Sequence, residues 1–531
     1  MFRAYRKFLI WAATAAVLGA PIAGITGAIA LGRLASTCGW DTASGWVQRE
    51  NAKAGYVGWS TGIPVEFAGD FSGKEKIARS HSFNLRSLQP QGTMVTGPEG
   101  WFSTSSATCG QIVPLHISGN GLPVKISVFR MGYYGGAGAR LIAQTATKPI
   151  AHFGSNMNNN VGHATITTNW PASWNFKINR NTSPGQYLVR LDDNTGDSNF
   201  VPIMVTNPNS HDEVTFVSSV LTWQSYNAWG SFSLYKGKNL SRATRSMVAS
   251  FNRPYDGDGS GQFRYMEYPL IRMTERLGID LNYMTDLELH NHRGALLNTK
   301  SIFLGGHSEY WTSEMRNVLD SSVAHGINLV SFGGNAGYNR PRLAANNRDL
   351  IMWRGASADP NRKNSVLATT RWRSAPISRP EASLLGSQYV GLGVNGDFSV
   401  TRPLRWPFAI LHGQTILKSV VGREVDSPLY SGGPAVENLA SAKLILNGKS
   451  LTAIATYYNN SKNAGVINIS TNGWVCAIAN VCPWHPAQFS ETSRSVQLVT
   501  QQILESLSKG PMGIWHPALV DISKRNHGSK F

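Results

Sequence analysis

Two glycine-rich turns carry side chains that could take part in hydrolysis. Residues 305–311 read GGHSEYW and residues 333–338 read GGNAGY. In the first turn, residues 306–310 nearly match the G-x-S-x-G turn of serine hydrolases, which would make Ser308 a nucleophile. Tyr310 stands where that turn needs its second glycine, so the sequence weighs against an activated Ser308. The His307-Ser308-Glu309 triplet also mimics the H-x-E of zinc deaminases, but no P-C-x-x-C follows, which excludes that class.

Both turns are expected at the carboxyl ends of parallel strands. Hydrophobic patterns predict strands over residues 214–221, 280–284, 301–304 and 327–332, with helices over residues 267–277 and 312–325. Gly278 and Gly326 directly follow the two helices, as C-terminal caps do. Alternating strands and helices indicate parallel βαβ units, whose sites lie at the carboxyl ends of the strands. We therefore expect an α/β domain over residues 211–510 with a mainly parallel sheet, in which residues 340–475 are irregular and β-rich.

Residues 40–210 show a different pattern. Short runs of branched and aromatic residues, separated by turns, predict strands over residues 112–117, 124–129, 184–191 and 200–205. No helical period of useful length appears there, so we expect an N-terminal immunoglobulin-like β-sandwich with a structural or docking role. Residues 207–210 form a polar linker, and residues 511–531 are expected to be a loosely attached basic tail.

The order of motifs resembles the large (beta) subunit of bacterial N,N-dimethylformamidase. The resemblance rests on residues 305–311 and 331–335 at the family's spacing, and it extends to residues 221–227, 233–235, 379–381 and 422–426. It covers roughly residues 110–500, and the combined order is more specific than any single motif. Members of that family are iron-dependent amide hydrolases, so the resemblance implies a glutamine-amidotransferase-like α/β fold, a mononuclear Fe³⁺ cofactor and a small amide substrate.

The resemblance also implies a ligand set. In the family two tyrosinates and one glutamate hold the ferric ion, and these correspond to Tyr226, Tyr235 and Glu309. Phenolate and carboxylate oxygens are hard donors that suit Fe³⁺ better than zinc. The stretch between the two tyrosines is shorter here than in the family's enzymes, so this register is the part of the assignment that the sequence leaves open.

Three further residues correspond to the family's pocket. His307 and Asn335 match residues that handle substrate and water, and Glu424 is a further polar residue. An imidazole can serve as the base or as the proton donor to the leaving amine. An amide can donate a hydrogen bond to a developing oxyanion. This chain differs from the family's enzyme, which is intracellular, pairs with a small subunit and is longer.

Each of these residues also has a plain structural interpretation. Tyr226 and Tyr235 lie in an aromatic run, where packing alone explains a tyrosine. Glu309 could complement the N-terminus of the helix over residues 312–325, and His307 could bond a neighbouring loop. Only the residues taken together predict a polar pocket.

The N-terminus predicts export. Arg3, Arg6 and Lys7 precede an uncharged run over residues 8–32, which is long enough to cross a hydrocarbon core of about 30 Å. The basic flank should stay in the cytoplasm, so we expect a periplasmic, cell-surface or secreted protein. Residues 1–39 are either a cleaved signal peptide or a retained membrane anchor, because the A-x-A site at residues 28–30 allows cleavage.

Four cysteines suit an exported chain. Cys476 and Cys482 enclose five residues and are predicted to bridge each other, which leaves Cys38 to pair with Cys109. None has the spacing of a C-x-x-C or zinc site, so structural disulfides are favoured over metal or redox roles.

The charge balance favours contact with anionic surfaces. Lys and Arg number 49 against 31 Asp and Glu, a net charge of +18. The cations are spread along the chain without any nucleic-acid-binding motif, so we expect no nucleic-acid partner and predict a solvated surface that meets cell-envelope polymers or lipids. The densest region is residues 340–379. Oligomeric state, including a homo-oligomer, stays open.

Three functions are consistent with the sequence. The first is an exported, iron-dependent hydrolase acting on a C–N amide bond. The second is a catalytically inactive binding module that docks on the cell envelope through the β-sandwich and the basic surface. The third is a serine hydrolase that uses Ser308. The first needs Tyr226, Tyr235 and Glu309 together, whereas the second needs none of them.

Overall fold

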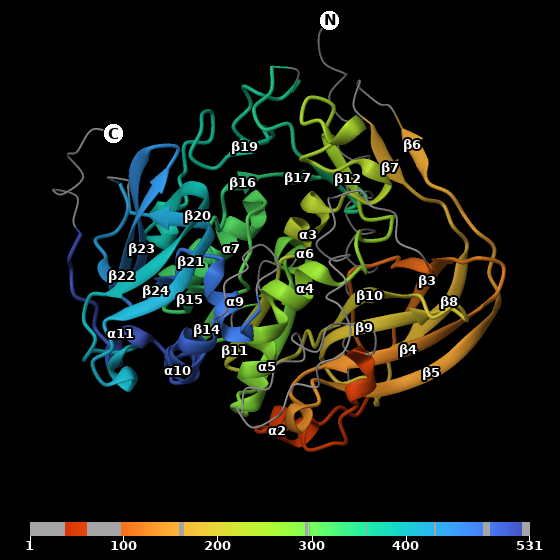
Figure 1. Cartoon of the computed structure of the whole chain (residues 1–531), viewed down its shortest axis with the longest axis horizontal. Helices are drawn as coiled ribbons and strands as arrows, with labels where there is room; N and C mark the ends of the chain where they lie inside the picture. Colours follow the sequence, from red (N-terminus) through yellow and green to blue (C-terminus); the bar gives the residue numbers. More distant parts are fainter. Residues whose placement is uncertain are drawn as a thin grey trace, which may run out of the picture.

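The computed structural model describes residues 38–60, 97–158, 164–291, 296, 298–357, 359–428, 432–481 and 489–522 of the 531-residue chain. The described chain has a mixed α/β fold, in which several smaller sheets accompany one nine-stranded sheet (Figure 1). The hydrophobic run of residues 8–32 lies outside the described residues. Within the described ranges, no helix is both long enough and apolar enough to cross a membrane.

Two sheets with a common core form the first part of the fold. Strands β1 (Glu99–Phe102), β3 (Ile112–Ser118) and β8 (Ala172–Lys177) form one sheet. The other has the order β2-β10-β9-β4-β5 and consists of β2 (Ser106–Ala107), β10 (Ser198–Val205), β9 (Gly185–Asp192), β4 (Pro123–Met131) and β5 (Ala139–Pro149). Both sheets contribute to one apolar cluster, with Leu115 from the first and Val128 and Val189 from the second. This agrees with the predicted β-sandwich, while its boundaries at residues 40 and 210 stay a prediction.

The nine-stranded sheet carries the predicted parallel strands at one end. It begins with β13 (Leu281–Thr285), β11 (Val214–Ser218), β14 (Ser301–Leu304), β15 (Asn328–Ser331) and β24 (Gly465–Asn468), which pair in parallel. It continues through antiparallel β23 (Lys449–Asn459), β22 (Glu437–Leu446), β20 (Gln388–Val400) and β21 (Ile416–Ser427). The sheet is therefore mixed rather than mainly parallel, because the second set of strands is joined without helical crossovers.

The two helices predicted over residues 267–277 and 312–325 are present as α5 (Tyr268–Arg276) and α7 (Ser313–Ala324), among several others. The helices of the α/β part are α3 (Val220–Tyr226), α4 (Gly261–Met266), α5, α6 (Asp286–Asn291), α7, α8 (Ala382–Leu385), α9 (Gly473–Ala479), α10 (Ser490–Leu507) and α11 (Met512–Trp515). Thr312 caps α7, because its Oγ1 accepts a hydrogen bond from the backbone N–H of Met315. Gly278 and Gly326 adopt φ of 72° and 99° after α5 and α7, a conformation that favours glycine. Both predicted C-terminal caps are thus present.

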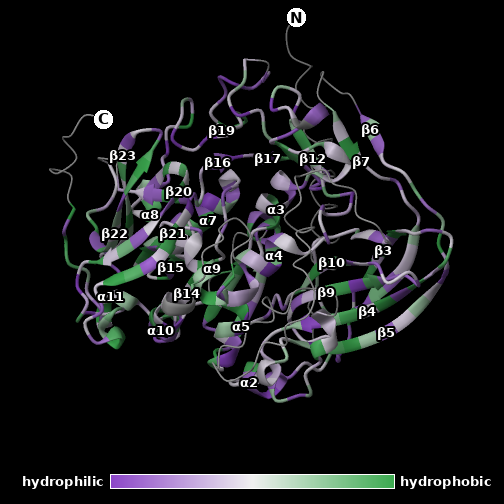
Figure 2. Ribbon diagram, viewed as in Figure 1, coloured by the Kyte–Doolittle hydropathy of each residue, from purple (hydrophilic) through white to green (hydrophobic). Residues whose placement is uncertain are grey.

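Short elements complete the described chain. These are α2 (Trp46–Asn51), the ribbon of β6 (Asn156–Asn158) with β7 (Thr165–Thr167), the pair β16 (Asn339–Arg340) and β19 (Thr370–Arg371), and the small sheet of β12 (Val248–Ser250), β18 (Asp349–Ile351) and β17 (Arg342–Leu343). Hydrophobic residues are concentrated on strands such as β4, β9 and β23, and the connecting loops are largely hydrophilic (Figure 2).

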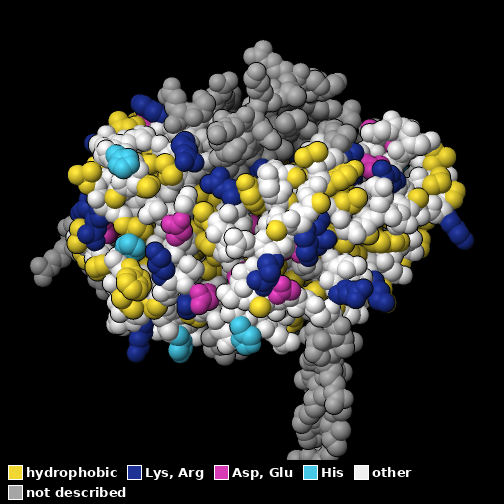
Figure 3. Space-filling view, turned by 90° about the horizontal axis from the view of Figure 1, so that it is seen from below, with side chains coloured by type: hydrophobic (Ala, Val, Ile, Leu, Met, Phe, Trp, Pro, Cys, Tyr) yellow, Lys and Arg dark blue, Asp and Glu magenta, His cyan; other side chains and the backbone are white. Residues whose placement is uncertain are grey.

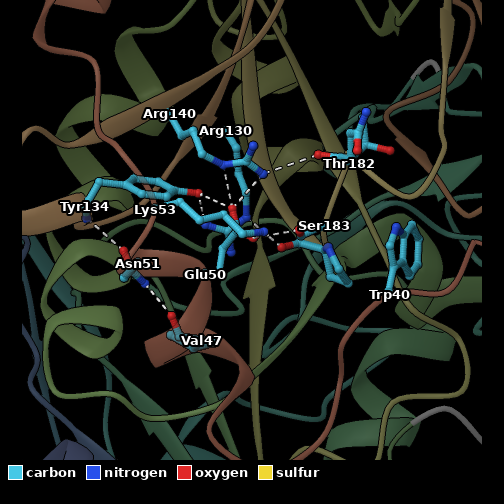
Figure 4. A network of polar contacts seen from close by, with 12 residues as sticks. Trp40, Val47, Glu50, Asn51, Lys53, Arg130, Tyr134, Arg140, Thr182 and Ser183 are labelled. Atoms are coloured by element: carbon cyan, nitrogen blue, oxygen red, sulfur yellow. Dashed lines mark hydrogen bonds and ion pairs between the residues drawn. The ribbon is translucent and has the colours of Figure 1, made fainter.

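Helix α2 is fastened to the rest of the fold by a buried polar network. Glu50 accepts hydrogen bonds from Arg140, Tyr134 and Ser183, and it forms an ion pair with Lys53 (Figure 4). The predicted Cys38–Cys109 disulfide is present and ties the segment before α2 to the β-sandwich. The second predicted bridge involves Cys482, which lies outside the described residues and leaves that bridge a prediction.

The basic region 340–379 is not simply a solvated surface. Arg340 is buried and donates to the carbonyl oxygens of Ser365 and Ala368. The guanidinium of Arg348 lies over the Trp101 ring, and that of Arg354 lies over the Tyr235 ring. Several of these arginines therefore contact carbonyl oxygens and aromatic rings within the fold rather than solvent alone. On the face seen in Figure 3, Lys and Arg side chains are scattered among acidic and apolar groups rather than gathered in one patch.

The start of the predicted basic tail is attached rather than loose. Leu519 donates its backbone N–H to Glu437, and Asp521 forms an ion pair with Arg402. Residues 523–531 lie outside the described part of the chain.

Candidate active site

The two glycine-rich turns lie side by side, as predicted. Residues 305–311 follow β14 and residues 333–338 follow β15, and these strands are parallel neighbours. A Cβ atom on Gly333 would lie 2.1 Å from the carbonyl oxygen of Gly306. The turns therefore approach so closely that only glycine fits at this point.

Glu309 and the two predicted tyrosines meet beside these turns. Tyr226, at the end of α3, donates its hydroxyl to Glu309 Oε2 at 2.6 Å. Tyr235 donates to the same carboxylate, at 2.7 Å from Oε1 and 2.8 Å from Oε2. The two phenol rings are stacked with their centroids 4.3 Å apart. Two phenol oxygens and one buried carboxylate thus converge on one point, so the sequence register of the tyrosines brings all three residues together.

A second group of side chains supports this cluster, and the sequence did not single it out. Asn339 donates to Glu309 Oε1 at 2.6 Å. Tyr310 donates to the Tyr235 hydroxyl at 2.8 Å, and Arg354 donates to the Tyr310 hydroxyl at 2.5 Å. The Arg354 guanidinium also lies 4.1 Å from the centroid of the Tyr235 ring. Tyr310 belongs to the GGHSEYW motif, which is the one signal that could have identified it.

His307 and Glu424 form the other half of the cluster. His307 Nε2 lies 3.1 Å from Glu424 Oε2 and 3.7 Å from Glu309 Oε2. Nε2 is buried and within ion-pair distance of Glu424, although it makes no hydrogen bond of good geometry with the described residues. Glu424 also accepts from Asn472 at 3.1 Å. His307 and Glu424 therefore form a buried imidazole–carboxylate pair beside Glu309.

The environment shifts the pKa values of the two carboxyl groups, Glu309 and Glu424, in opposite directions. Burial raises the pKa of Glu309, and the nearby Glu424 carboxylate adds to this effect. Burial also disfavours the charge on Glu424, but His307, together with Arg423 and a hydrogen bond from Asn472, outweighs burial and lowers the pKa of Glu424. Burial and the Glu309 carboxylate raise the pKa of Tyr226 and of Tyr235 well above the ordinary value for tyrosine. The two phenols therefore keep their protons and donate them in hydrogen bonds to Glu309.

Asn335 lies on the second turn, in a left-handed conformation with φ of 61°. Its backbone N–H donates to Asp426 at 2.7 Å, and its Oδ1 has no hydrogen-bond partner in the described parts of the chain. A Cβ on the preceding Gly334 would lie 2.6 Å from the carbonyl oxygen of Glu424. The turn thus packs against the backbone of Glu424, which contacts His307, and the pocket role of Asn335 stays a prediction.

Comparison with known proteins identifies the family. The model of a family described as "N,N-dimethylformamidase beta subunit-like, C-terminal" matches residues 125–486. The chain belongs to this family. Membership suggests a dimethylformamidase-like amide hydrolase, and the matched range contains every residue of the cluster described above.

The other comparisons add little to this assignment. A search of curated proteins finds no significant match. Among solved structures, a cycloisomaltooligosaccharide glucanotransferase from Paenibacillus sp., complexed with cycloisomaltoheptaose, aligns with 8% identity and a TM-score of 0.17. The alignment covers 59% of this chain and 62% of that one, so this chain spans less than two thirds of that protein's length. This likeness carries no argument about fold or function.

The donor set in this member of the dimethylformamidase-like family fits a hard cation. The described residues contain no cluster of three or more His, Cys, Asp or Glu side chains arranged for a metal ion. The oxygens of Tyr226, Tyr235 and Glu309 are a different set, and they already converge within hydrogen-bond distance. Phenolate and carboxylate oxygens suit Fe³⁺, and a cation at this point would take the place of the protons that they now share.

The geometry does not favour a serine nucleophile. The Ser308 hydroxyl accepts a hydrogen bond from the indole N–H of Trp311 at 2.9 Å, and the serine is buried. Glu309, in turn, faces the tyrosines and Asn339 rather than the N-terminus of α7, where Glu314 occupies the first turn. Its alternative role as a helix-capping charge is therefore not supported.

Proposed function

We propose that the protein is an exported, iron-dependent hydrolase that cleaves a C–N amide bond in a small molecule. The observation that carries the proposal is the convergence of the Tyr226, Tyr235 and Glu309 oxygens beside the His307–Glu424 pair. Membership of the dimethylformamidase-like family supports the amide as substrate class.

In this proposal Tyr226, Tyr235 and Glu309 hold the iron. A ferric ion would supply Lewis-acid polarisation of the amide carbonyl and activation of water. Tyr310 and Arg354 stabilise negative charge on Tyr235, because one donates a hydrogen bond to its oxygen and the other places a cation over its ring. Asn339 fixes the orientation of the Glu309 carboxylate.

His307 moves the protons. Amide hydrolysis requires a proton to leave the attacking water and a proton to reach the departing nitrogen, so that the C–N bond breaks with a neutral amine as leaving group. His307 Nε2 can take the first proton and give the second, and the Glu424 carboxylate at 3.1 Å stabilises the imidazolium between the two events. Asn335 is proposed to donate a hydrogen bond to the developing oxyanion. Burial of these residues keeps bulk water out.

Export has separate support. The Cys38–Cys109 disulfide hints at an extracytoplasmic location, since such bonds persist in oxidising compartments. The basic N-terminal flank and the run of residues 8–32 predict the same. We propose contact with anionic envelope polymers or lipids as a secondary property of the charged surface.

The test is hydrolysis of small formamides and acetamides by protein reconstituted with iron, measured as release of amine. We expect Glu424→Gln to lower kcat by about 10²-fold or more, because the imidazolium loses its counter-charge. Glu381→Gln serves as the matched control, since Glu381 is also a buried carboxylate but pairs with Arg373. Wild-type protein that holds iron and cleaves none of these amides would contradict the proposal and favour the inactive binding module.

A further inference from the structure

A cavity of about 30 Å³ lies between the β-sandwich and the α/β part. Strands β1 and β10 line one side, and α3 together with residues 251–255 and Arg348 lines the other. The lining includes Trp101, Val201, Trp223, Arg253, Tyr255 and Arg348. A single buried water needs about 10–15 Å³ of such space, so the cavity has room for two or three water-sized groups.

Two of the residues that line this cavity carry hydrogen-bond donors without acceptors. The indole Nε1 of Trp101 and the guanidinium Nε of Arg253 are buried without a partner in the described residues. The two residues are only 8% and 2% exposed. Because a buried donor without an acceptor is costly, such atoms indicate a ligand that accepts hydrogen bonds.

The charges at the cavity are positive and lack a close counter-ion. Arg253 donates its other nitrogens to the backbone carbonyls of Asn227, Trp229 and Phe232. Arg348 donates to the carbonyls of Phe102 and Phe251 and to the side chain of Asn252. Neither arginine forms an ion pair with a carboxylate in the described chain.

Burial lowers the pKa of both guanidinium groups to about 10, which reflects this missing compensation. Two carboxyl groups act on them only through space, Asp256 on Arg253 and Asp349 on Arg348. Asp256 accepts a hydrogen bond from the backbone N–H of Ala228, and Asp349 accepts one from Asn346.

We propose that this cavity binds a small monovalent anion, either a halide or a carboxylate of one or two carbons. Water could also accept the two free donors, but it brings no charge to a site with two buried guanidinium groups. The cavity holds only two or three water-sized groups, which suits a halide or a short carboxylate and leaves no room for larger organic anions.

Anion binding should stabilise the segment that leads to the candidate active site. Arg253 holds the carbonyls of residues 227, 229 and 232, which lie between Tyr226 and Tyr235. An anion that compensates the charge of Arg253 therefore favours the conformation of this segment. The proposal does not depend on iron or on amide hydrolysis, since it rests only on the cavity and its donors.

The first experiment measures the Tm of the purified protein as millimolar sodium chloride, bromide, formate or acetate replaces sodium gluconate at constant total sodium concentration. A ligand that binds only the native state raises the Tm with its concentration. We expect the Tm to rise as the small anion replaces gluconate and then to level off as one site is filled. A Tm that does not change in any of the four replacements would overturn the proposal.

The second experiment removes one donor. Trp101→Phe keeps an aromatic ring that can stack on His116 but loses the indole N–H. We expect the anion concentration that gives half of the Tm rise to increase by roughly tenfold. Trp174→Phe, in the same sandwich but outside the cavity lining, is the matched control and should leave this concentration unchanged. An unchanged response in Trp101→Phe would contradict the assignment.

A third measurement needs only the wild-type protein and remains decisive if the variant fails to fold. Crystals grown in bromide should show an anomalous peak within hydrogen-bond distance of Trp101 Nε1 and Arg253 Nε. Density for water alone, without an anomalous peak, would overturn the proposal.

Discussion

Replacing Glu50 by Gln should destabilise the fold in a pH-dependent way. Burial disfavours the charge on Glu50, but Arg130 and Arg140, with hydrogen bonds from Lys53 and Ser183, outweigh burial and lower its pKa from 4.5 to about 2. At about 1.36 kcal/mol for each pKa unit, this gap corresponds to about 3 kcal/mol of stability. Glu50 is only 3% exposed, so solvent screening removes little of that value.

The sign of the pH dependence follows from the lowered pKa. Because the folded protein holds the carboxylate more strongly than the unfolded chain, the contribution is fully present above pH 4.5 and is lost as the pH falls towards 2. We therefore expect the Glu50→Gln variant to unfold at lower urea concentration than wild type at pH 7. The difference between the two should shrink steadily when the series is repeated below pH 4.5.

The assay is equilibrium urea unfolding followed by tryptophan fluorescence, with disulfides intact. Glu213→Gln is the matched control, because Glu213 pairs with Lys300 at the surface, where its side chain is 49% exposed and the pair contributes about 0–1 kcal/mol. A Glu50→Gln variant that loses no more stability than this control, or a loss that is equal at pH 7 and pH 3, would refute the reasoning.

Three further predictions concern the disulfide, the iron environment and the serine. Replacing Cys38 and Cys109 together by Ser opens a link between residues 71 apart and should cost about 4 kcal/mol in urea unfolding; an unchanged midpoint would show that the bond adds no stability. Tyr310→Phe should keep the iron but shift its visible charge-transfer band, because the hydroxyl that donates to Tyr235 is lost; an unaltered spectrum would exclude this influence. Ser308→Ala should leave amide hydrolysis essentially unchanged, whereas loss of activity in steady-state kinetics would revive the serine hydrolase.

More of the candidate site than of the surrounding fold could be predicted from the sequence. Glu309 lies in the glycine-rich turn that follows β14, so its position near the end of that strand could be predicted from the local pattern. Tyr226 ends helix α3 and Tyr235 lies in the loop that follows, and only the family resemblance indicated them. Tyr310 and Arg354 were missed because their roles depend on contacts between residues far apart in sequence, which no local pattern records.

The antiparallel strands of the mixed sheet could not be located from the hydrophobic pattern of the sequence. Strands β20 and β21 pair with register shifts at residues 389–391, 392–394 and 396–398, and such bulges break the alternation of apolar and polar residues. Residues 340–475 therefore appeared irregular. In the same way, the count of basic residues over 340–379 could not reveal that Arg340, Arg348 and Arg354 contact carbonyl oxygens and aromatic rings inside the protein.

The measurement that tests the account most directly is the iron content of the purified protein, taken together with its visible spectrum. If Tyr226, Tyr235 and Glu309 bind Fe³⁺, wild type should hold about one iron per chain and be coloured by phenolate-to-iron charge transfer. Glu309→Gln should lose most of the iron and the colour while it keeps the fold. Glu314→Gln, which changes a neighbouring carboxylate paired with His290, should keep both. A colourless, iron-free wild type that gains no thermal stability from added iron would contradict the account.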